Sequence, residues 1–181
     1  SKIANKIITV AGTNGKGSTV SFLESILTEK KYNVGTFTSP HILRYNERIK
    51  INGIEIEDES LLETFEMIDE VRGDTTLTYF EFATLSAFYL FSKSNLDVAV
   101  LEVGLGGRLD ATNIVDSDIS IITSIGIDHT EFLGNTIDSI ALEKAGVMRP
   151  FKTCIYAQEK PPAALLKYAK NKSVNLLIHN N

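Results

Sequence analysis

The chain has 181 residues, enough for one ordinary domain with a buried core. Hydrophobic residues make up 43% of it and charged residues 23%, a composition typical of a soluble globular protein. The net charge of -5 excludes a general electrostatic attraction to nucleic acids or anionic membranes, although it leaves room for a local basic cluster.

No apolar run approaches the roughly 20 residues that a membrane-spanning helix needs, and the chain reaches an expected strand too early for a signal peptide. The single cysteine, Cys154, excludes an internal disulfide and agrees with a reducing compartment. We therefore expect a cytoplasmic protein with no nucleic-acid or membrane partner.

Short apolar runs alternate with helical patterns in the first half of the chain. Asn52 and Gly53 stand between runs of alternating isoleucine and suit the tight turn of a hairpin. In chain order we predict a strand, a helix, a strand, a hairpin and two helices at residues 6–11, 17–31, 33–38, 48–57, 60–72 and 78–92.

The last two of these helices carry capping signals. Ser60 and Glu63 have the spacing of a capping box, although Asp58 competes as the cap. Thr78 and Glu81 have the same spacing. We expect these side chains to close the first turn of each helix.

The alternation continues in the second half, where the apolar runs are continuous, as expected for strands covered by helices on both faces. We predict strands at 97–103, 118–125, 153–158 and 174–179, with helices at 136–146 and 162–171. The whole pattern predicts an α/β fold: a doubly wound, mostly parallel sheet with a phosphate-binding loop and a small β-hairpin.

The stretch VAGTNGKGST, residues 10–19, joins the first strand to the first helix. A standard phosphate-binding loop reads G-x-x-x-x-G-K-[ST]. Here Gly15 and Lys16 are followed by Gly17, and Val10 stands where the pattern has its first glycine. The match to the standard spacing is therefore imperfect.

The physical parts of such a loop are nevertheless present. Glycines let the backbone turn sharply and direct N–H groups at one point, and the following helix N-terminus favours an anion. Lys16 would contact the β and γ phosphates, and Ser18 or Thr19 would bind a phosphate or a magnesium ion. The alternative, a plain turn with a surface lysine, leaves this composition unexplained. The candidate nucleotide-binding residues are Gly12, Thr13, Asn14, Gly15, Lys16, Gly17, Ser18 and Thr19.

Glu102 and His129 follow apolar strands whose carboxyl ends should lie beside the phosphate crevice. Glu102 would serve as a magnesium ligand; the alternative is a salt-bridged carboxylate at the sheet edge. A lone glutamate in an apolar strand is costly to bury, which favours the functional interpretation. His129 is either a structural residue or part of the site, and Asp128 beside it is an alternative acidic ligand. His41 carries less weight.

Five segments appear in an order that resembles a known family: VAGTNGKGST, TSPHILRYNERI, LEVGLGGRLDATN, SIGIDHTEFLG and EKAGVMRP. From about residue 7 to residue 158 the chain is similar to the folylpolyglutamate synthase and dihydrofolate synthase family, within the Mur ligase superfamily. The resemblance implies a central ATP-binding domain of the Mur ligase type. The shortened glycine loop is that family's own version.

The resemblance also implies an ATP-dependent amide ligase. ATP would phosphorylate a carboxylate of dihydropteroate or a folate, and the amine of L-glutamate would attack the acyl phosphate. The sequence does not distinguish making dihydrofolate from extending polyglutamates. Two alternatives stay open: another Mur-type amino-acid ligase, and a nucleotide-binding module without ligase chemistry.

Catalytic and metal-binding roles follow from the same resemblance. It implies that Lys16 holds the phosphates and that Ser39 and Glu102 bind one Mg²⁺ ion. A second Mg²⁺ would be bound by Glu102 and His129 with Lys144, which carries a carbamate in this family. Taken without the resemblance, Lys144 would be an exposed helix lysine.

The segment SPHILRYNERI is expected to border the pocket for the pterin or folate. Arg44 and Arg48 would pair there with a substrate carboxylate, or would equally be surface residues. Asp110 and Asn113, in GGRLDATN, are expected near the floor of the active site.

Members of this family carry a further part of the ATP-binding domain and then a C-terminal ligase domain. Residues 1–181 are therefore expected to be a partial ATP-binding domain that lacks the C-terminal domain and has little activity alone. A monomer is the expected state for this family.

Overall fold

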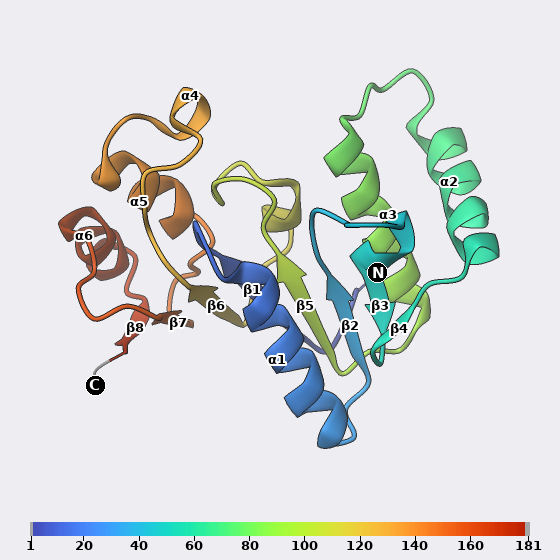
Figure 1. The fold of residues 1–181 in the computed structure, drawn as a ribbon, viewed down its shortest axis with the longest axis horizontal. Helices are drawn as coiled ribbons and strands as arrows, with labels where there is room; N and C mark the ends of the chain where they lie inside the picture. The colour runs from blue at the N-terminus through green and yellow to red at the C-terminus, as the bar shows by residue number, and fades with distance from the viewer. Residues whose placement is uncertain (1, 180–181) are drawn as a thin grey trace.

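The computed structural model of the protein describes residues 2–179 and contains one eight-stranded sheet (Figure 1). The strands are β1 (Lys6–Ala11), β2 (Val34–Phe37), β3 (Ile49–Ile51), β4 (Ile54–Glu55), β5 (Val98–Glu102), β6 (Ile119–Ile122), β7 (Thr153–Tyr156) and β8 (Asn175–Ile178). The helices are α1 (Lys16–Glu29), α2 (Asp58–Arg72), α3 (Tyr79–Lys93), α4 (Thr130–Leu133), α5 (Ile137–Ala145) and α6 (Ala163–Asn171), and two 3-10 helices are η1 (Tyr45–Arg48) and η2 (Ala111–Ile114).

The strands lie in the order β4-β3-β2-β5-β1-β6-β7-β8. The pairs from β2 through β5, β1, β6 and β7 to β8 are parallel, whereas β3 pairs antiparallel with both β2 and β4. The chain leaves β1 towards β2 on one side, whereas β5 connects across β1 to β6 on the other side. This reversal beside β1 creates a crevice at the carboxyl ends of the strands, where open α/β sheets bind ligands.

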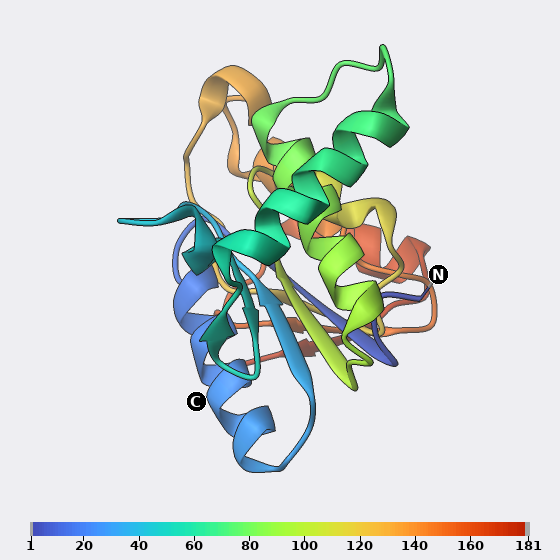
Figure 2. The same ribbon diagram turned by 90° about the vertical axis from the view of Figure 1, so that its right-hand side faces the viewer.

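Helices cover both faces of the sheet, which confirms the predicted doubly wound fold (Figures 1 and 2). Helix α1 packs alone on one face, where Val10, Val34 and Val100 form a buried cluster with Val20. Helices α2 and α3, and beyond them α5 and α6, lie on the opposite face. Successive strand residues alternate between these clusters, as the period of two requires.

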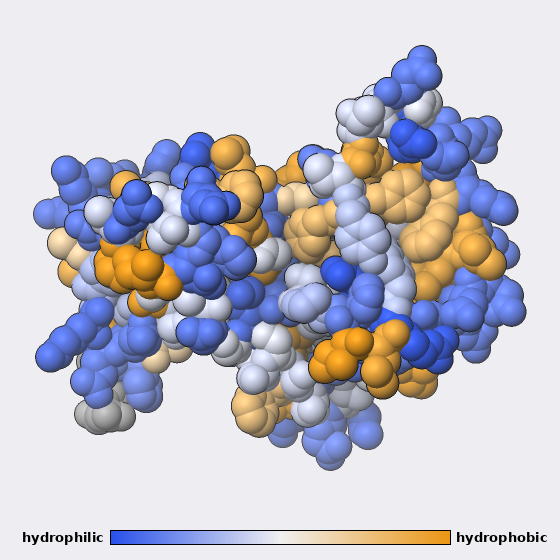
Figure 3. All heavy atoms as spheres, turned by 45° about the horizontal axis from the view of Figure 1, so that its top comes forward, coloured by the Kyte–Doolittle hydropathy of each residue, from blue (hydrophilic) through white to orange (hydrophobic). Residues whose placement is uncertain are grey.

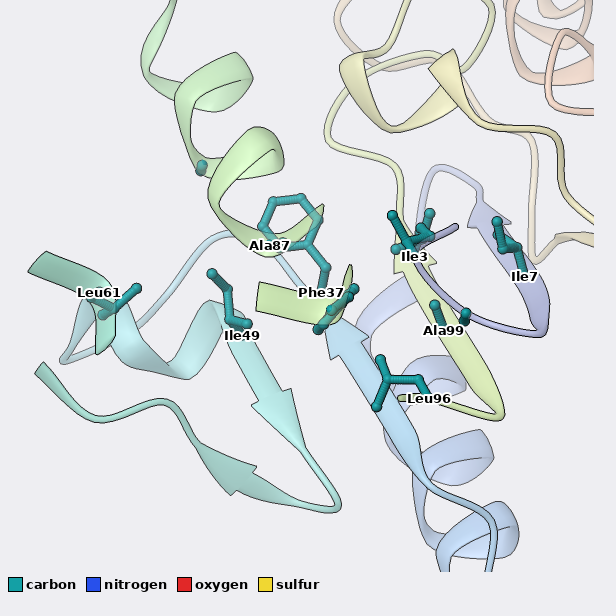
Figure 4. Close-up of a cluster of buried hydrophobic side chains, with 12 residues drawn as sticks. Ile3, Ile7, Phe37, Ile49, Leu61, Ala87, Leu96 and Ala99 are labelled. Atoms are coloured by element: carbon teal, nitrogen blue, oxygen red, sulfur yellow. The ribbon is translucent and has the colours of Figure 1, made fainter. Parts of the chain in front are cut away.

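The core under α2 and α3 joins residues that are far apart in sequence (Figure 4). Phe37, Ile49 and Ala99 come from three strands, and they pack with Leu61 of α2 and Ala87 of α3. Complete burial of a side chain such as Phe37 contributes about 2 kcal/mol to stability. This core fixes the carboxyl ends of β2 and β5, which carry part of the candidate site.

The predicted order of strands and helices is confirmed, but the predicted start of α2 is wrong. Helix α2 begins at Asp58, with Glu57 as its N-cap and no side-chain capping bond, so Ser60 lies inside the helix. Asp58 and Glu59 in the first turn favour this earlier start through the helix dipole. The Thr78–Glu81 capping box of α3 is confirmed, with backbone-to-side-chain bonds of 3.2 and 2.7 Å.

Three short elements were not predicted: η1, η2 and α4. Each has four residues, too few for a hydrophobic period to appear. Within residues 2–179, no helix has the length and apolar character to cross a membrane.

Candidate active site

The turn between β1 and α1 requires glycine at two positions. Gly12 has a φ of 152°, and a Cβ atom there would lie 1.9 Å from Thr123 Oγ1. Gly15 is left-handed, with a φ of 82°, and α1 begins at the next residue, Lys16. The glycines therefore allow β1 to pass directly into a helix N-terminus, whose first N–H groups have no partner within the helix.

Hydrogen bonds join this glycine loop to the segment that follows β6. The Thr13 N–H donates to the Ser124 carbonyl (2.9 Å), and the Asn14 N–H donates to Ser124 Oγ (2.9 Å). Thr13 Oγ1 accepts from the Gly126 N–H (3.0 Å), and Thr123 Oγ1 donates to the Asn14 carbonyl (2.7 Å). The loop is thus held in one shape by its neighbour in the sheet.

Lys16 folds back over the loop. Its Nζ donates to the Gly12 carbonyl at 3.0 Å, which places the ammonium group in the crevice. Thr19 donates its hydroxyl to the Gly15 carbonyl (2.8 Å), whereas Ser18 is exposed. The positive end of the α1 dipole and the Lys16 charge therefore act at the same place.

Glu102 ends β5 and is only 4% exposed. Its Oε2 accepts the Ser39 N–H at 3.1 Å, and Gly17 of α1 leaves space beside the carboxylate. Burial raises the pKa of Glu102, while the Ser39 N–H and the Lys16 charge act in the opposite direction. The structure therefore places Ser39, Glu102 and Lys16 in one neighbourhood.

Lys144 is 4% exposed on α5, which corrects the expectation of an exposed helix lysine. This burial arises because Lys144 lines the cleft, where α5 faces the loops that follow β1, β5 and β6. Burial, and to a lesser extent the Lys16 charge, lower the pKa of Lys144 to about 8, while Asp128 acts in the opposite direction. Two lysines thus share a site in which Glu102 interacts with Lys16 and Asp128 interacts with Lys144.

His129 follows β6 and caps the short helix α4 in a left-handed conformation, with a φ of 47°. Its side chain is 57% exposed, and its Nε2 lies 3.6 Å from Asp128 Oδ2. The histidine is therefore a partly solvated group at the rim of the crevice, not a buried structural residue.

One small cleft brings together candidate residues from four segments of the chain. It is lined by Gly12, Lys16, residues 103–106, Asp128, His129 and Lys144. Figure 3 brings this edge of the sheet forward and shows mainly hydrophilic and neutral residues in its middle, with apolar residues gathered to either side. The loops after β1, β5 and β6 and helix α5 therefore meet at one polar site.

The donor set around the cleft fits magnesium chemistry. Glu102 and the Ser39 hydroxyl offer oxygen ligands, as does Asp128. No group of three or more His, Cys, Asp or Glu residues within the described chain is arranged to hold a metal ion. A cation here would therefore depend on hydroxyl, phosphate and water oxygens in addition to these carboxylates.

The two arginines proposed for the substrate carboxylate have different settings. Arg44 is exposed and pairs with Asp58 at 3.3 Å. Arg48 is 6% exposed and donates from Nε to His41 Nδ1 at 2.8 Å, which excludes its interpretation as a surface residue. Its guanidinium group lies over the ring of Tyr79, 5.2 Å from the centroid. The structure does not place either arginine among the lining residues of the polar cleft.

Glu47 shapes the loop between these arginines and is a residue that the sequence did not single out. Its carboxylate accepts the N–H groups of Ile42, Leu43 and Arg44 at 2.7 to 2.8 Å. These bonds lower the pKa of Glu47 to about 2. No Ser or Thr stands three residues before Glu47 to mark a capping box, so the sequence carried no signal for this loop.

A second pocket of about 350 Å³ adjoins the polar cleft and shares Leu105 and Gly106 with it. Phe80 and Phe132 contribute aromatic side chains to it, and Asp110 also lines it. Asp110 Oδ2 accepts the Leu105 N–H at 2.9 Å, so this carboxylate holds the wall between the two cavities. Asp110 therefore lies near the site, as expected.

Comparisons with known proteins agree on one family. Residues 10–180 match the model of the Mur ligase middle domain. The dihydrofolate synthase/folylpolyglutamate synthase of Escherichia coli (strain K12) is 49% identical over 175 residues, which cover 97% of this chain and 42% of that protein. The corresponding protein of Buchnera aphidicola (subsp. Schizaphis graminum) is 51% identical over 168 residues, 93% of this chain and 40% of the relative.

Solved structures agree in three dimensions. The chain superposes on the E. coli FolC structure in complex with DHPP and ADP with a TM-score of 0.96 at 48% sequence identity; the match covers 98% of this chain and 43% of that one. A bifunctional folylpolyglutamate synthase/dihydrofolate synthase with Mn, AMPPNP and L-glutamate bound gives a TM-score of 0.93 at 51% identity, with 98% and 44% covered.

Proposed function

The chain belongs to the Mur ligase middle-domain family, among the dihydrofolate and folylpolyglutamate synthases, and from this we propose that it forms the ATP-binding part of an amide ligase. It spans about two-fifths of the length of the curated relatives that it matches. We therefore propose that residues 1–181 are a partial ATP-binding domain, and that a C-terminal ligase domain completes the enzyme.

The observation that carries this proposal is the meeting of Lys16 and Lys144 in one cleft at the N-terminus of α1. Lys16 and the α1 dipole suit the phosphates of ATP, because both contribute positive charge at the same point, while Lys144 lies on the other wall of the cleft as a position for a metal ligand. The Glu102 carboxylate beside them suits the divalent cation that accompanies ATP. Relatives in this family were solved with ADP or with AMPPNP and Mn.

In the proposed reaction, the substrate carboxylate oxygen bonds to the γ phosphorus as the bond to the β-bridging oxygen breaks, which gives ADP and an acyl phosphate. The L-glutamate amine then adds to the acyl carbon, loses a proton, and inorganic phosphate leaves. Lys16 and the N–H groups of α1 bind and orient the phosphates throughout. Magnesium, when bound, neutralises charge on the transferring phosphoryl group.

We assign one cation to Ser39 and Glu102, and a second to Glu102, His129 and Lys144. A buried ammonium group at Lys144 would repel a cation, whereas a carbamate there would present an anionic oxygen. Carbamylation of Lys144 is therefore part of the proposal. Asp128, in the same cleft, is a further oxygen donor close to this second position.

We propose dihydropteroate or a folate, together with L-glutamate, as the substrates, because solved relatives hold DHPP in one case and L-glutamate in another. The pocket beside the cleft, lined by Phe80 and Phe132, suits a flat aromatic group. Arg48 is a buried cation that donates to His41 Nδ1 and forms no salt bridge with any carboxylate of the described residues, so it suits a substrate carboxylate. Arg44 is the second candidate.

The test uses the full-length chain that contains residues 1–181. We expect Lys16→Ala to lower ADP release, driven by dihydropteroate and L-glutamate, by at least about 100-fold, because phosphate stabilisation is lost. Lys167→Ala, an exposed lysine on α6, is the matched control and should retain the wild-type rate. Normal glutamate ligation by the Lys16 variant would overturn the role proposed for the glycine loop, whereas nucleotide binding by a wild-type chain that ligates no glutamate would favour a nucleotide-binding module. Turnover of a muramyl substrate in place of dihydropteroate would favour another Mur-type ligase.

A further inference from the structure

The last turn of α5, which carries Lys144, lies directly against the backbone of the loop that follows β5. A Cβ atom on Gly107 would lie 2.8 Å from the Glu143 carbonyl and 3.2 Å from Lys144 Cα. A Cβ atom on Gly146 would lie 2.4 Å from Arg108 Cβ. Two glycines are therefore needed for this approach, and the Arg108 N–H closes it with a 2.8 Å bond to the Glu143 carbonyl.

Asn113 links the same two segments through its side-chain amide. Its Nδ2 donates to the Arg108 carbonyl and to the Gly146 carbonyl, each at 3.1 Å. One side chain of η2 therefore satisfies a carbonyl on the loop after β5 and a carbonyl just beyond α5. Neither carbonyl belongs to a strand, so the sheet offers them no partner.

Arg149 completes the link from the other side. Its Nη2 donates to the Asn113 carbonyl and Oδ1, both at 2.9 Å, and to the Val115 carbonyl at 3.1 Å. Its Nη1 donates to the Gly146 carbonyl at 3.2 Å, and its Nε pairs with Asp116. The side chain is only 17% exposed, so the planar guanidinium group acts here as a largely buried connector of carbonyls.

We propose that Asn113 and Arg149 are positioning residues that fix Lys144 in the phosphate cleft. Both contact the Gly146 carbonyl, two residues from Lys144, while the linked loop supplies Leu105 and Gly106 to the opposite wall of that cleft. The clasp formed by Asn113, Arg149, Gly107 and Gly146 thus sets the distance between the two walls. This inference rests on the proposed function for its catalytic consequence, but the position of Lys144 can be tested separately.

A general role in stability is the competing explanation, and conservative variants separate the two. Arg149→Lys keeps the charge and the reach to Asp116 but loses the planar fork that joins several carbonyls. Asn113→Asp keeps the shape and the oxygen that accepts from Arg149 but removes both Nδ2–H donors. Arg72→Lys is the matched control, because Arg72 pairs with Asp69 on α2, away from the clasp.

The first readout is the accessibility of the Lys144 amine, measured by mass spectrometry in the full-length chain as its rate of reductive methylation in buffer free of bicarbonate and metal, where Lys144 is not carbamylated. Wild-type Lys144 is buried and should react slowly. We expect both clasp variants to react several-fold faster at Lys144 while Lys167 on α6 reacts at an unchanged rate. Unchanged Lys144 reactivity together with a lowered melting temperature would overturn the inference and leave a purely structural role.

The second readout is the catalytic consequence. We expect the clasp variants to lower kcat and the affinity of the weaker Mn²⁺ site by about 10-fold or more, with the KM for ATP changed less than about twofold. The Arg72 control should match the wild type in both. If the wild-type full-length chain shows no ligase activity but Lys144 is still methylated faster in the clasp variants, the proposed function is refuted and the clasp is supported. If the clasp variants show faster methylation with the wild-type kcat, the catalytic consequence of the clasp is refuted.

Discussion

At the scale of single residues, the site depends on charges that the fold holds partly out of water. Glu102 and Lys144 are each 4% exposed. Burial raises the pKa of Glu102 and lowers the pKa of Lys144, and both shifts favour the neutral form of the side chain. A protein tolerates such groups at a cost in stability, and that cost is recovered when ligands bring charges of the opposite sign. The sequence indicated Glu102 from its place in an apolar strand, whereas the burial of Lys144 depends on contacts between distant segments.

Replacement of Glu102 by glutamine separates this cost from its proposed role. Glu102→Gln removes a buried charge but keeps an oxygen that can accept the Ser39 N–H. We expect the melting temperature of the metal-free protein at pH 7 to stay the same or rise, while ligase turnover of the full-length chain falls by at least about 100-fold. Thermal denaturation and ADP release measure the two effects. A large loss of stability with retained turnover would contradict this view of Glu102.

Cys154 gives a prediction about pH at a site remote from the chemistry. Burial raises the pKa of the Cys154 thiol to about 11, above its usual 9.0. At pH 9 about 1% of the thiol is therefore ionised in the folded protein, against about half in the unfolded chain. We expect iodoacetamide to alkylate the native protein far more slowly than the urea-unfolded protein at this pH. Equal rates would show that β7 is open in solution.

At the scale of secondary structure, elements with a long hydrophobic period were predictable and those fixed by backbone chemistry were less so. The strand-helix alternation identified the parallel sheet because continuous apolar runs need cover on both faces. Helix α4 and the turn η1 were not predictable, since their four residues are fixed by His129 in a left-handed conformation and by the Glu47 carboxylate. The buried stack of Arg48 on Tyr79 likewise depends on tertiary contacts.

The two predicted capping boxes provide a matched pair of variants. Thr78 forms its box with Glu81, so Thr78→Ala should lower the free energy of unfolding by about 1 kcal/mol. Ser60 lies inside α2 and does not form the predicted box, so Ser60→Ala should change stability by less than about 0.5 kcal/mol. Urea denaturation followed by circular dichroism measures both. An equal loss in the two variants would contradict the capping assignments.

At the scale of the whole molecule, one polar cleft and its adjoining aromatic pocket occupy one edge of the sheet. The family could be identified from five ordered sequence segments, and the fold from their setting. The distance between the cleft and the arginines, and the clasp on Lys144, could not be read from the sequence, because they depend on how loops from β2, β5 and α5 pack. The proposed monomeric state stays a prediction.

The length of the relatives leads to a prediction about the isolated chain. Residues 1–181 cover about two-fifths of those proteins, and a complete ligase needs groups that bind the nucleotide base and the incoming amino acid. We expect this polypeptide alone to bind ATP and magnesium weakly and to show no detectable glutamate ligation, whereas the full-length chain does. Isothermal titration with ATP and an assay for ADP release make the comparison. Full activity of residues 1–181 would refute the partial-domain assignment.

The bonds between the glycine loop and the segment after β6 have a mechanical consequence. Thr13 contacts Gly126 and Asn14 contacts Ser124, and the segment leads within three residues from Gly126 to His129. A nucleotide that displaced the glycine loop would also displace the segment that leads to His129, because hydrogen bonds join the two. Binding of a phosphate to the glycine loop is therefore expected to change the position of His129 before the chemical step begins.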